Sequence, residues 1–287
     1  MISQRAMISQ RESHVSHEPV AMAFGLVTYM WGADWPLATL LRACRESQVR
    51  GVELRTTHAH RVEPSLDASA RADVRRRFED ARITLVGIGS NERFDHRDPA
   101  DLTKAIDASK RFIELSHDVG GTGVKVKPDR FHPGIPHEKT IEQIGNALRK
   151  LGAFGEGFGQ EIRLEVHGQC AELATIEAIM KVADHPNVRI CWNSNAQDLK
   201  PPGLKANFQR VRRWFGKTVH VRELNATGYP FDQLLQMLVA SNYEGWVLLE
   251  GRAFPKSTPE RIAALAKQRQ LFDRLVNRSA NRSNPTD

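Results

Sequence analysis

Cysteine is scarce in this sequence, and the few cysteines do not pair. The chain of 287 residues contains three, Cys44, Cys170 and Cys191, which form neither a CxxC motif nor a zinc-type cluster. Widely spaced cysteines of odd number are typical of a protein that keeps its thiols reduced. We therefore expect a cytoplasmic protein without disulfides.

Long apolar runs are also missing. No stretch approaches the roughly 20 apolar residues of a membrane-spanning helix, and the first 20 residues lack the apolar core of a secretory signal. Residues 1–20 are polar and repeat the sequence MISQR, while residues 277–287 are polar and rich in Asn and Ser. We therefore predict a disordered leader at 1–20, a disordered tail at 277–287 and no membrane partner.

Nucleotide-binding loops are absent as well. The first apolar segment runs into TYMWGADW and not into a GxGxxG or GxxxxGK[ST] loop, which disfavours a dinucleotide-binding open sheet. Lys and Arg outnumber Asp and Glu by 41 to 34, a balance that would suit an anionic partner. Because the excess is scattered along the chain, we do not expect nucleic acid to be that partner.

What the sequence does have is a regular alternation of two patterns. Short, β-branched apolar segments bounded by turn residues are followed by longer segments of helical period. The predicted strands are 23–30, 50–55, 83–89, 121–127, 161–167, 188–193, 218–224 and 245–251. Their near-continuous apolar character indicates a parallel sheet buried on both faces. Eight strands alternating with eight helices predict a single α/β domain, a (β/α)8 TIM barrel at 21–276, with an open doubly wound sheet as the alternative.

Polar side chains stand where these strands end. Barrel enzymes build their active sites at the carboxyl ends of the strands, and an unpaired charge inside a core is costly. The residues concerned are Trp31 and Asp34, then Arg55, His58 and His60, then Ser90, Asn91 and Glu92, then Lys125 and Lys127, then Glu165 and His167, then Asn193 and Asn195, then His220, Glu223 and Asn225, and finally Glu250 and Arg252.

Four of these residues recur at matched depth on consecutive strands: Glu165, Asn193, His220 and Glu250. Their spacings of 28, 27 and 30 residues each correspond to one strand–helix unit. Taken one at a time, each residue has an ordinary structural explanation. His220 could be a hydrogen-bonded histidine of the core, Glu250 could be a salt-bridge partner, and Asn193 could simply end its strand. Together they predict a divalent-metal site, since such oxygen and nitrogen ligands favour Mn²⁺, Mg²⁺, Co²⁺ or Fe²⁺, with Zn²⁺ as a further candidate.

Five segments stand in an order and spacing that resembles the xylose isomerase-like TIM barrels. They are GVELR at 51–55, GIGSNERF at 87–94, LEVHG at 164–168, HVREL at 220–224 and GWVLLE at 245–250. The family includes sugar phosphate isomerases and epimerases, ketose 3-epimerases and, more distantly, endonuclease IV. The resemblance implies that Glu165, His220 and Glu250 bind the metal, that Glu165 and Glu250 also transfer protons, and that His167 faces the substrate.

The chain departs from the ketose epimerases at three positions. Asn193 stands where the family usually has Asp, which predicts weaker metal binding. Ala196 replaces a substrate-binding His, and Ala226 replaces an Arg that follows the residue equivalent to Asn225. These differences argue against a simple ketose as the substrate and leave the general site in place.

A metal-centred pocket of this kind predicts proton transfer beside a carbonyl group, through an enediolate, in a sugar, sugar phosphate or related polyol or keto compound. The outcome would be isomerisation or epimerisation, with Glu165 and Glu250 as the acid/base pair. Six more residues are expected to bind the substrate: His167, Arg55, Lys127, Asn195, Glu223 and Arg252. The basic groups Arg55, Lys125, Lys127 and Arg252 could hold a phosphate or carboxylate; alternatively, the two lysines pair with Glu165 or Glu92.

Two other functions stay open. The loss of the strand-six acid fits a non-catalytic barrel that binds a sugar-like ligand. The high pI of 9.5 invites a DNA phosphodiesterase like endonuclease IV, although WNSN at 192–195 cannot supply the DTxH-type ligands of that branch. The resemblance also allows a homo-oligomer.

Overall fold

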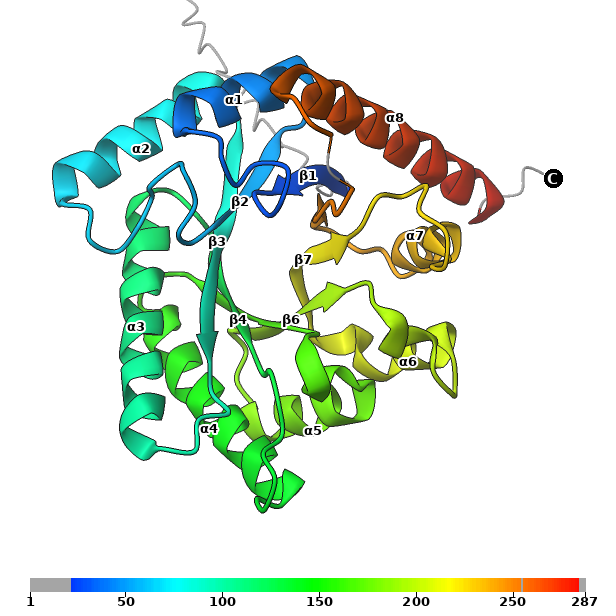
Figure 1. Ribbon diagram of the computed structural model, residues 1–287. Coiled ribbons are helices and arrows are strands. Elements are labelled where there is room, and N and C mark those ends of the chain that lie inside the picture. The colour runs from blue at the N-terminus through cyan, green and yellow to red at the C-terminus, as the bar shows by residue number, and fades with distance from the viewer. Residues whose placement is uncertain (1–21, 254, 284–287) are drawn as a thin grey trace, which may run out of the picture.

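Eight strands pair in parallel with their neighbours in chain order and close into a barrel, because β8 also pairs with β1. The computed structural model describes residues 22–253 and 255–283. Figure 1 shows the helices around the outside of the barrel. The predicted (β/α)8 TIM barrel is confirmed.

The strands are β1 (Ala23–Val27), β2 (Gly51–Arg55), β3 (Thr84–Arg93), β4 (Gly123–Lys127), β5 (Glu161–Glu165), β6 (Val188–Asn193), β7 (Phe215–Val221) and β8 (Trp246–Leu249). The helices are α1 (Leu37–Glu46), α2 (Ala68–Ala81), α3 (Pro99–Asp118), α4 (His137–Glu156), α5 (Leu173–Ala183), α6 (Leu204–Val211), α7 (Phe231–Ala240) and α8 (Thr258–Ser283), with short 3₁₀ turns η1 (Gly168–Ala171), η2 (Ala196–Leu199) and η3 (Arg212–Trp214). All eight predicted strands are present.

The last helix extends further than the sequence predicts. α8 continues to Ser283, into the segment whose composition predicts a tail. The predicted leader at 1–20 lies outside the described residues. No helix in the described part of the chain combines the length and apolar character needed to cross a membrane. The three cysteines are buried and free.

Alternation along the strands separates an apolar exterior from a polar interior. Successive side chains of a strand point to opposite faces, and in β4 Val124 and Val126 belong to the apolar core cluster, while Lys125 and Lys127 lie on the other face. Because helices cover the outer face, the lysines face the inside of the barrel. The interior is therefore suited to chemistry rather than to packing alone.

Arg163 closes the amino-terminal end of this interior. It is fully buried, and its guanidinium donates to the Val86 carbonyl, the Thr122 hydroxyl and the Glu161 carboxylate, each at 2.9 Å. Gly123 makes room for it, since a Cβ there would lie 2.7 Å from the Arg163 guanidinium carbon. Because a satisfied charged group fills this end, the interior residues available for chemistry lie toward the carboxyl ends of the strands.

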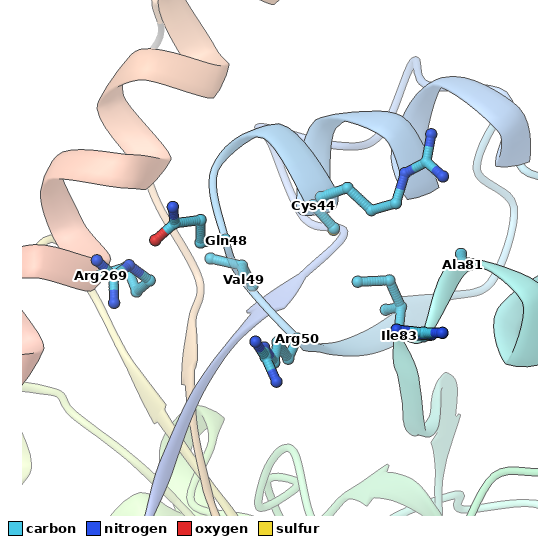
Figure 2. A pocket seen from close by; sticks show the side chains of 9 residues that line it. Cys44, Gln48, Val49, Arg50, Ala81, Ile83 and Arg269 are labelled. Carbon is cyan, nitrogen blue, oxygen red and sulfur yellow. The ribbon is translucent and has the colours of Figure 1, made fainter.

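A surface pocket lies at the same amino-terminal end (Figure 2). Four arginines line it: Arg45, Arg50, Arg82 and Arg269. The first three are exposed, and Arg269 is paired with Asp273 at 2.5 Å. Figure 2 shows Arg50 and Arg269 reaching the pocket from different elements. The three exposed arginines are solvated, and none of the four belongs to the predicted site.

Candidate active site

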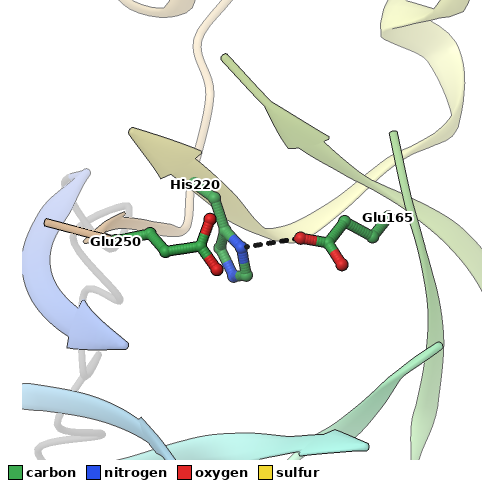
Figure 3. Close-up of side chains that lie close together, drawn as sticks. All are labelled: Glu165, His220 and Glu250. Carbon is green, nitrogen blue, oxygen red and sulfur yellow. Dashed lines mark ion pairs between the residues drawn. The ribbon is translucent and has the colours of Figure 1, made fainter. Parts of the chain in front are cut away.

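Three predicted ligands converge at the carboxyl ends of their strands. Glu165 ends β5, His220 lies in β7 and Glu250 directly follows β8. All three are buried, and one ligand atom from each lies within 4.8 Å of the others (Figure 3). Because parallel strands of a barrel end at one mouth, residues separated by a whole strand–helix unit become neighbours.

Asn193, the fourth predicted ligand, also reaches this cluster. It is the last residue of β6 and 7% exposed. Its amide nitrogen donates to Glu165 Oε1 at 2.9 Å. In this orientation the amide supports Glu165, and rotation of the amide by half a turn would present its oxygen instead.

Lys125 is part of the same cluster. Its ammonium, buried completely, lies 2.7 Å from Glu165 Oε2. Burial, the largest single effect, would raise the pKa of Glu165, but the charge of Lys125 together with the hydrogen bond and charge of His220 and the charge of His167 outweighs it and holds that pKa well below its usual range. The pKa of Lys125 is raised in turn, because Glu165 and Glu53 outweigh the opposite effect of burial. Of the two alternatives for this lysine, pairing with Glu165 is the one observed.

Glu53 is a site residue that the sequence reasoning missed. It is fully buried in the middle of β2, and its carboxylate lies 3.3 Å from His220 Nε2. The contact orients the imidazole, so that Nδ1 points toward Glu165 Oε1 at 3.6 Å. This Nδ1 is buried and has no hydrogen-bond partner among the described residues. A carboxylate behind a histidine is a common way to hold a metal ligand in position.

The residues therefore fit a divalent cation. Glu165 and Glu250 offer carboxylate oxygens, and His220 offers its buried Nδ1, which accepts or donates no hydrogen bond among the described residues. Mixed carboxylate and imidazole ligands suit Mn²⁺, Mg²⁺ or Co²⁺. Two cations already offset part of the negative charge, Lys125 at Glu165 and Arg55 at 3.8 Å from Glu250 Oε1. We expect this offset to weaken binding relative to a site with uncompensated carboxylates.

Arg55 and Lys127, both predicted to bind substrate, stand above the cluster at the mouth. Arg55 Nη2 donates to Asn91 Oδ1 at 2.8 Å, and Lys127 Nζ lies 3.5 Å from the same oxygen. Asn91 is reached because β3 continues through Ser90 to Arg93. The three residues form a polar rim that we call the Arg55–Asn91–Lys127 rim.

His167 also lies at the mouth, just beyond β5. Its Nδ1 lies 2.8 Å from Asp129 Oδ1, and its side chain is 39% exposed. The hydrogen bond from His167 lowers the pKa of Asp129 more than burial raises it. Asp129 was not anticipated, because it follows β4 by two residues and only the fold brings it beside His167.

Of the other predicted substrate-binding residues, Asn195 and Glu223 contact backbone groups of the loops, and Arg252 is exposed. Asn195 donates to the backbone carbonyls of Val166 and Asn193, and it accepts from the backbone of the next turn. The Glu223 carboxylate accepts from the backbone nitrogens of Arg252 and Ala253, at 2.8 and 2.5 Å. Asn195 and Glu223 shape the loops around the mouth, and the structure does not bring them to the carboxylate cluster.

Asp198 supports the loop after β6 and makes stability depend on pH. Its carboxyl accepts from Asn195 N at 3.0 Å and from the Tyr229 hydroxyl at 2.7 Å. Burial raises its pKa from 3.8 to about 7. Between these values the folded state keeps a proton that the unfolded state has released, so the free energy of unfolding falls as pH rises from ~4 to 7 and is level above.

We expect Asp198→Asn to remove this fall, which amounts to up to roughly 4 kcal/mol. The amide can still accept both hydrogen bonds, and it carries no charge to desolvate. Urea unfolding at pH 5 and at pH 8 measures the effect. An unchanged difference between the two pH values in Asp198→Asn would assign the pH dependence to another group.

Residues 41–272 match a family model described as xylose isomerase-like TIM barrel. No protein of curated function matches the chain in sequence.

Three solved structures with a similar fold have low sequence identity. L-ribulose 3-epimerase superposes with a TM-score of 0.78 at 15% identity, covering 91% of this chain and 97% of its own. 3-Keto-D-glucoside 4-epimerase YcjR from E. coli gives 0.73 at 17%, with 87% and 99% covered. A xylose isomerase-like TIM barrel protein from Mycobacterium smegmatis in complex with magnesium gives 0.66 at 15%, with 90% and 98% covered. At this identity the likeness concerns the fold.

Proposed function

The chain belongs to the xylose isomerase-like TIM barrel family, and from this premise we propose that it is a divalent-metal-dependent isomerase or epimerase of a carbohydrate-like carbonyl compound. The observation that supports this most is the buried Glu165–His220–Glu250 group at the strand ends. Several solved structures of similar fold are titled as sugar epimerases, which agrees with a small carbohydrate substrate.

Proton transfer is the chemistry that the two glutamates can perform. Glu165 is committed to Lys125 and Asn193 through both of its oxygens. Glu250 makes no side-chain hydrogen bond within the described residues, and its nearest cation is Arg55 at 3.8 Å. Glu250 is therefore the better placed base for a proton beside the substrate carbonyl, and Glu165 is the partner carboxylate.

A cation held by Glu165, His220 and Glu250, with Asn193 as a further oxygen ligand, would supply polarisation of the substrate carbonyl. The remaining groups position the substrate. His167, fixed by Asp129, and the Arg55–Asn91–Lys127 rim surround the mouth above the carboxylates. Burial of the cluster excludes water, which strengthens each electrostatic contact with the reacting atoms.

Two observations favour a second candidate, a barrel that binds a sugar-like ligand without converting it. Lys125 already provides Glu165 with a cation at 2.7 Å, and Asn193 replaces the acid that the family usually has. Both features lower the negative charge available to a divalent ion.

Metal analysis combined with hydrogen exchange tests the proposal. The purified protein is analysed for bound metal, loaded with Mn²⁺, Mg²⁺ or Co²⁺, and incubated in D₂O with a panel of ketoses, keto acids and their phosphates. We expect one ion per chain and deuterium at the carbon next to the carbonyl, detected by proton NMR. Ligand binding without deuterium incorporation in any of these compounds would instead support the binding protein.

A further inference from the structure

The charged side chains inside the barrel lie at two levels. The levels differ in how closely each cation is paired with a carboxylate. At the deeper level each cation faces a carboxylate: Lys125 lies against Glu165, and His220 lies against Glu53. At the level of the mouth stand Arg55 and Lys127, whose shared hydrogen-bond acceptor is the neutral amide oxygen of Asn91. An amide oxygen satisfies donors but supplies no negative charge.

Lys127 is the least compensated of these groups. It lies two residues after Lys125 and therefore on the same face of β4, half-buried in the mouth. Its one hydrogen bond is the 3.5 Å contact with Asn91, and no ion pair joins it to a carboxylate in the part of the chain that the structure describes. Burial, together with the charges of Lys125 and Arg55, lowers its pKa. Glu165 and Asp129 oppose this effect only in part, and the ammonium has no paired carboxylate among the described residues.

Arg55 is held in a fixed position and has spare donors. Its guanidinium lies 5.3 Å from the centre of the Tyr29 ring, donates to Asn91 at 2.8 Å and lies 3.8 Å from Glu250. Its Nε is buried without a hydrogen-bond partner among the described residues. A fixed guanidinium with a free donor is well suited to a planar or tetrahedral anion.

Apart from Glu250, which lies 3.8 Å from Arg55, the acidic residues after β3 and β4 are engaged elsewhere. Asp129 holds His167 at 2.8 Å and lies 3.8 Å from Arg93. Burial raises the pKa of Glu92, and its cationic neighbours are Arg93 and Arg111 rather than the rim. No carboxylate of the described residues therefore forms an ion pair with Lys127, and Glu165 and Asp129 offset its charge only in part, from beyond ion-pair distance.

We infer that the substrate of this site carries an anionic group, a phosphate or a carboxylate, which Lys127 and Arg55 bind at the mouth while the reacting carbons lie over Glu165 and Glu250. The inference rests on the proposed function and narrows its substrate class to sugar phosphates or sugar acids. It also gives a physical reason for two basic residues at a mouth where a neutral sugar would need only hydrogen bonds. A phosphate and a carboxylate would be bound by the same two cations, and binding experiments distinguish between them.

Calorimetry with three probes tests this inference: D-fructose 6-phosphate, D-gluconate and the neutral D-fructose. We expect wild-type protein to bind at least one anionic probe more than tenfold tighter than D-fructose. Lys127→Met should weaken binding of that probe by about tenfold to a hundredfold, since hydrogen bonds between charged groups contribute on the order of that factor. Its affinity for D-fructose should fall by a much smaller factor, because a neutral sugar can lose only a hydrogen bond to the ammonium. Lys139→Met, which removes an exposed lysine of α4, is the matched control.

Asn91→Asp provides a second variant that keeps both cations. A carboxylate between Arg55 and Lys127 would neutralise the rim, and because Asn91 is exposed, the fold should tolerate it. We expect the same selective loss of anion affinity. Equal binding of neutral and anionic probes by wild-type protein, or unchanged anion affinity in both variants, would overturn the inference.

The outcome is separable from that of the proposed function. Exchange of deuterium into D-fructose and its phosphate with equal efficiency would support the function and contradict the anionic substrate. A preference for anions that depends on Lys127, without exchange in any compound, would contradict the function and leave the anion site supported. The anionic probe that binds more tightly shows whether the anionic group is a phosphate or a carboxylate.

Discussion

Replacing Glu250 with Gln is expected to abolish deuterium exchange, with a loss on the order of a thousandfold. The side chain keeps its shape and its contact with Arg55, but an amide cannot accept the proton from the carbon beside the carbonyl. Glu250 is singled out because its carboxylate has the fewest partners in the cluster, whereas Glu165 is bound on one oxygen by Lys125 and on the other by Asn193.

Metal analysis of Glu250→Gln separates the two roles of this residue. Retained ion with lost exchange would assign proton transfer to Glu250, and loss of both would assign it mainly to ion binding. Glu138→Gln on the exposed start of α4 is the matched control and should exchange at the wild-type rate. Full exchange in Glu250→Gln would remove this residue from the mechanism.

The parts of the site that could be predicted from the sequence lie at strand ends. Glu165, Asn193 and Glu250 follow or end apolar segments, so a polar residue there breaks the pattern visibly. Barrel topology then requires such ends to meet. The strand count and order were predictable for the same reason, since near-continuous apolar segments alternate with helical periodicity over the whole domain.

Glu53 and Asp129 escaped prediction for different physical reasons. Glu53 lies inside GVELR, where alternation on a strand buried on both faces gives no sign that one buried position opens into a polar interior. Its only signal was a lone acid between Val52 and Leu54. Asp129 becomes significant through its partner His167, 38 residues away, and no local pattern encodes that distance.

Polar residues at strand ends can also stabilise the loops instead of taking part in the reaction. Asn195 and Glu223 stand at such positions, yet their side chains bind backbone groups that the loops would otherwise leave unsatisfied. Both roles favour polar residues after a strand, because buried backbone donors and acceptors need partners too. Sequence alone therefore places more residues at the site than the geometry brings to the carboxylates.

Asn193→Asp is expected to raise the affinity for a divalent ion by about tenfold to a hundredfold, because the number of charged ligands sets affinity in oxygen-rich sites. Without the ion, the new carboxylate would lie against Glu165 Oε1 in place of the present 2.9 Å hydrogen bond. The ion-free variant should therefore be less stable than wild type, by on the order of 1–3 kcal/mol. Added Mn²⁺ should recover that stability, since a ligand of the folded state alone raises the melting temperature.

Titration calorimetry and thermal unfolding with and without Mn²⁺ measure both effects. Asn187→Asp, which adds the same charge just before the other end of β6, should change neither ion affinity nor its coupling to stability. Lys125→Met should act in the same direction as Asn193→Asp, because it frees Glu165 Oε2 from its internal cation. If wild-type protein binds ion and both variants bind it more tightly, Lys125 and Asn193 tune a working metal site. If only the variants bind, Lys125 serves as the resident cation, and the role of a sugar-binding barrel gains the stronger support.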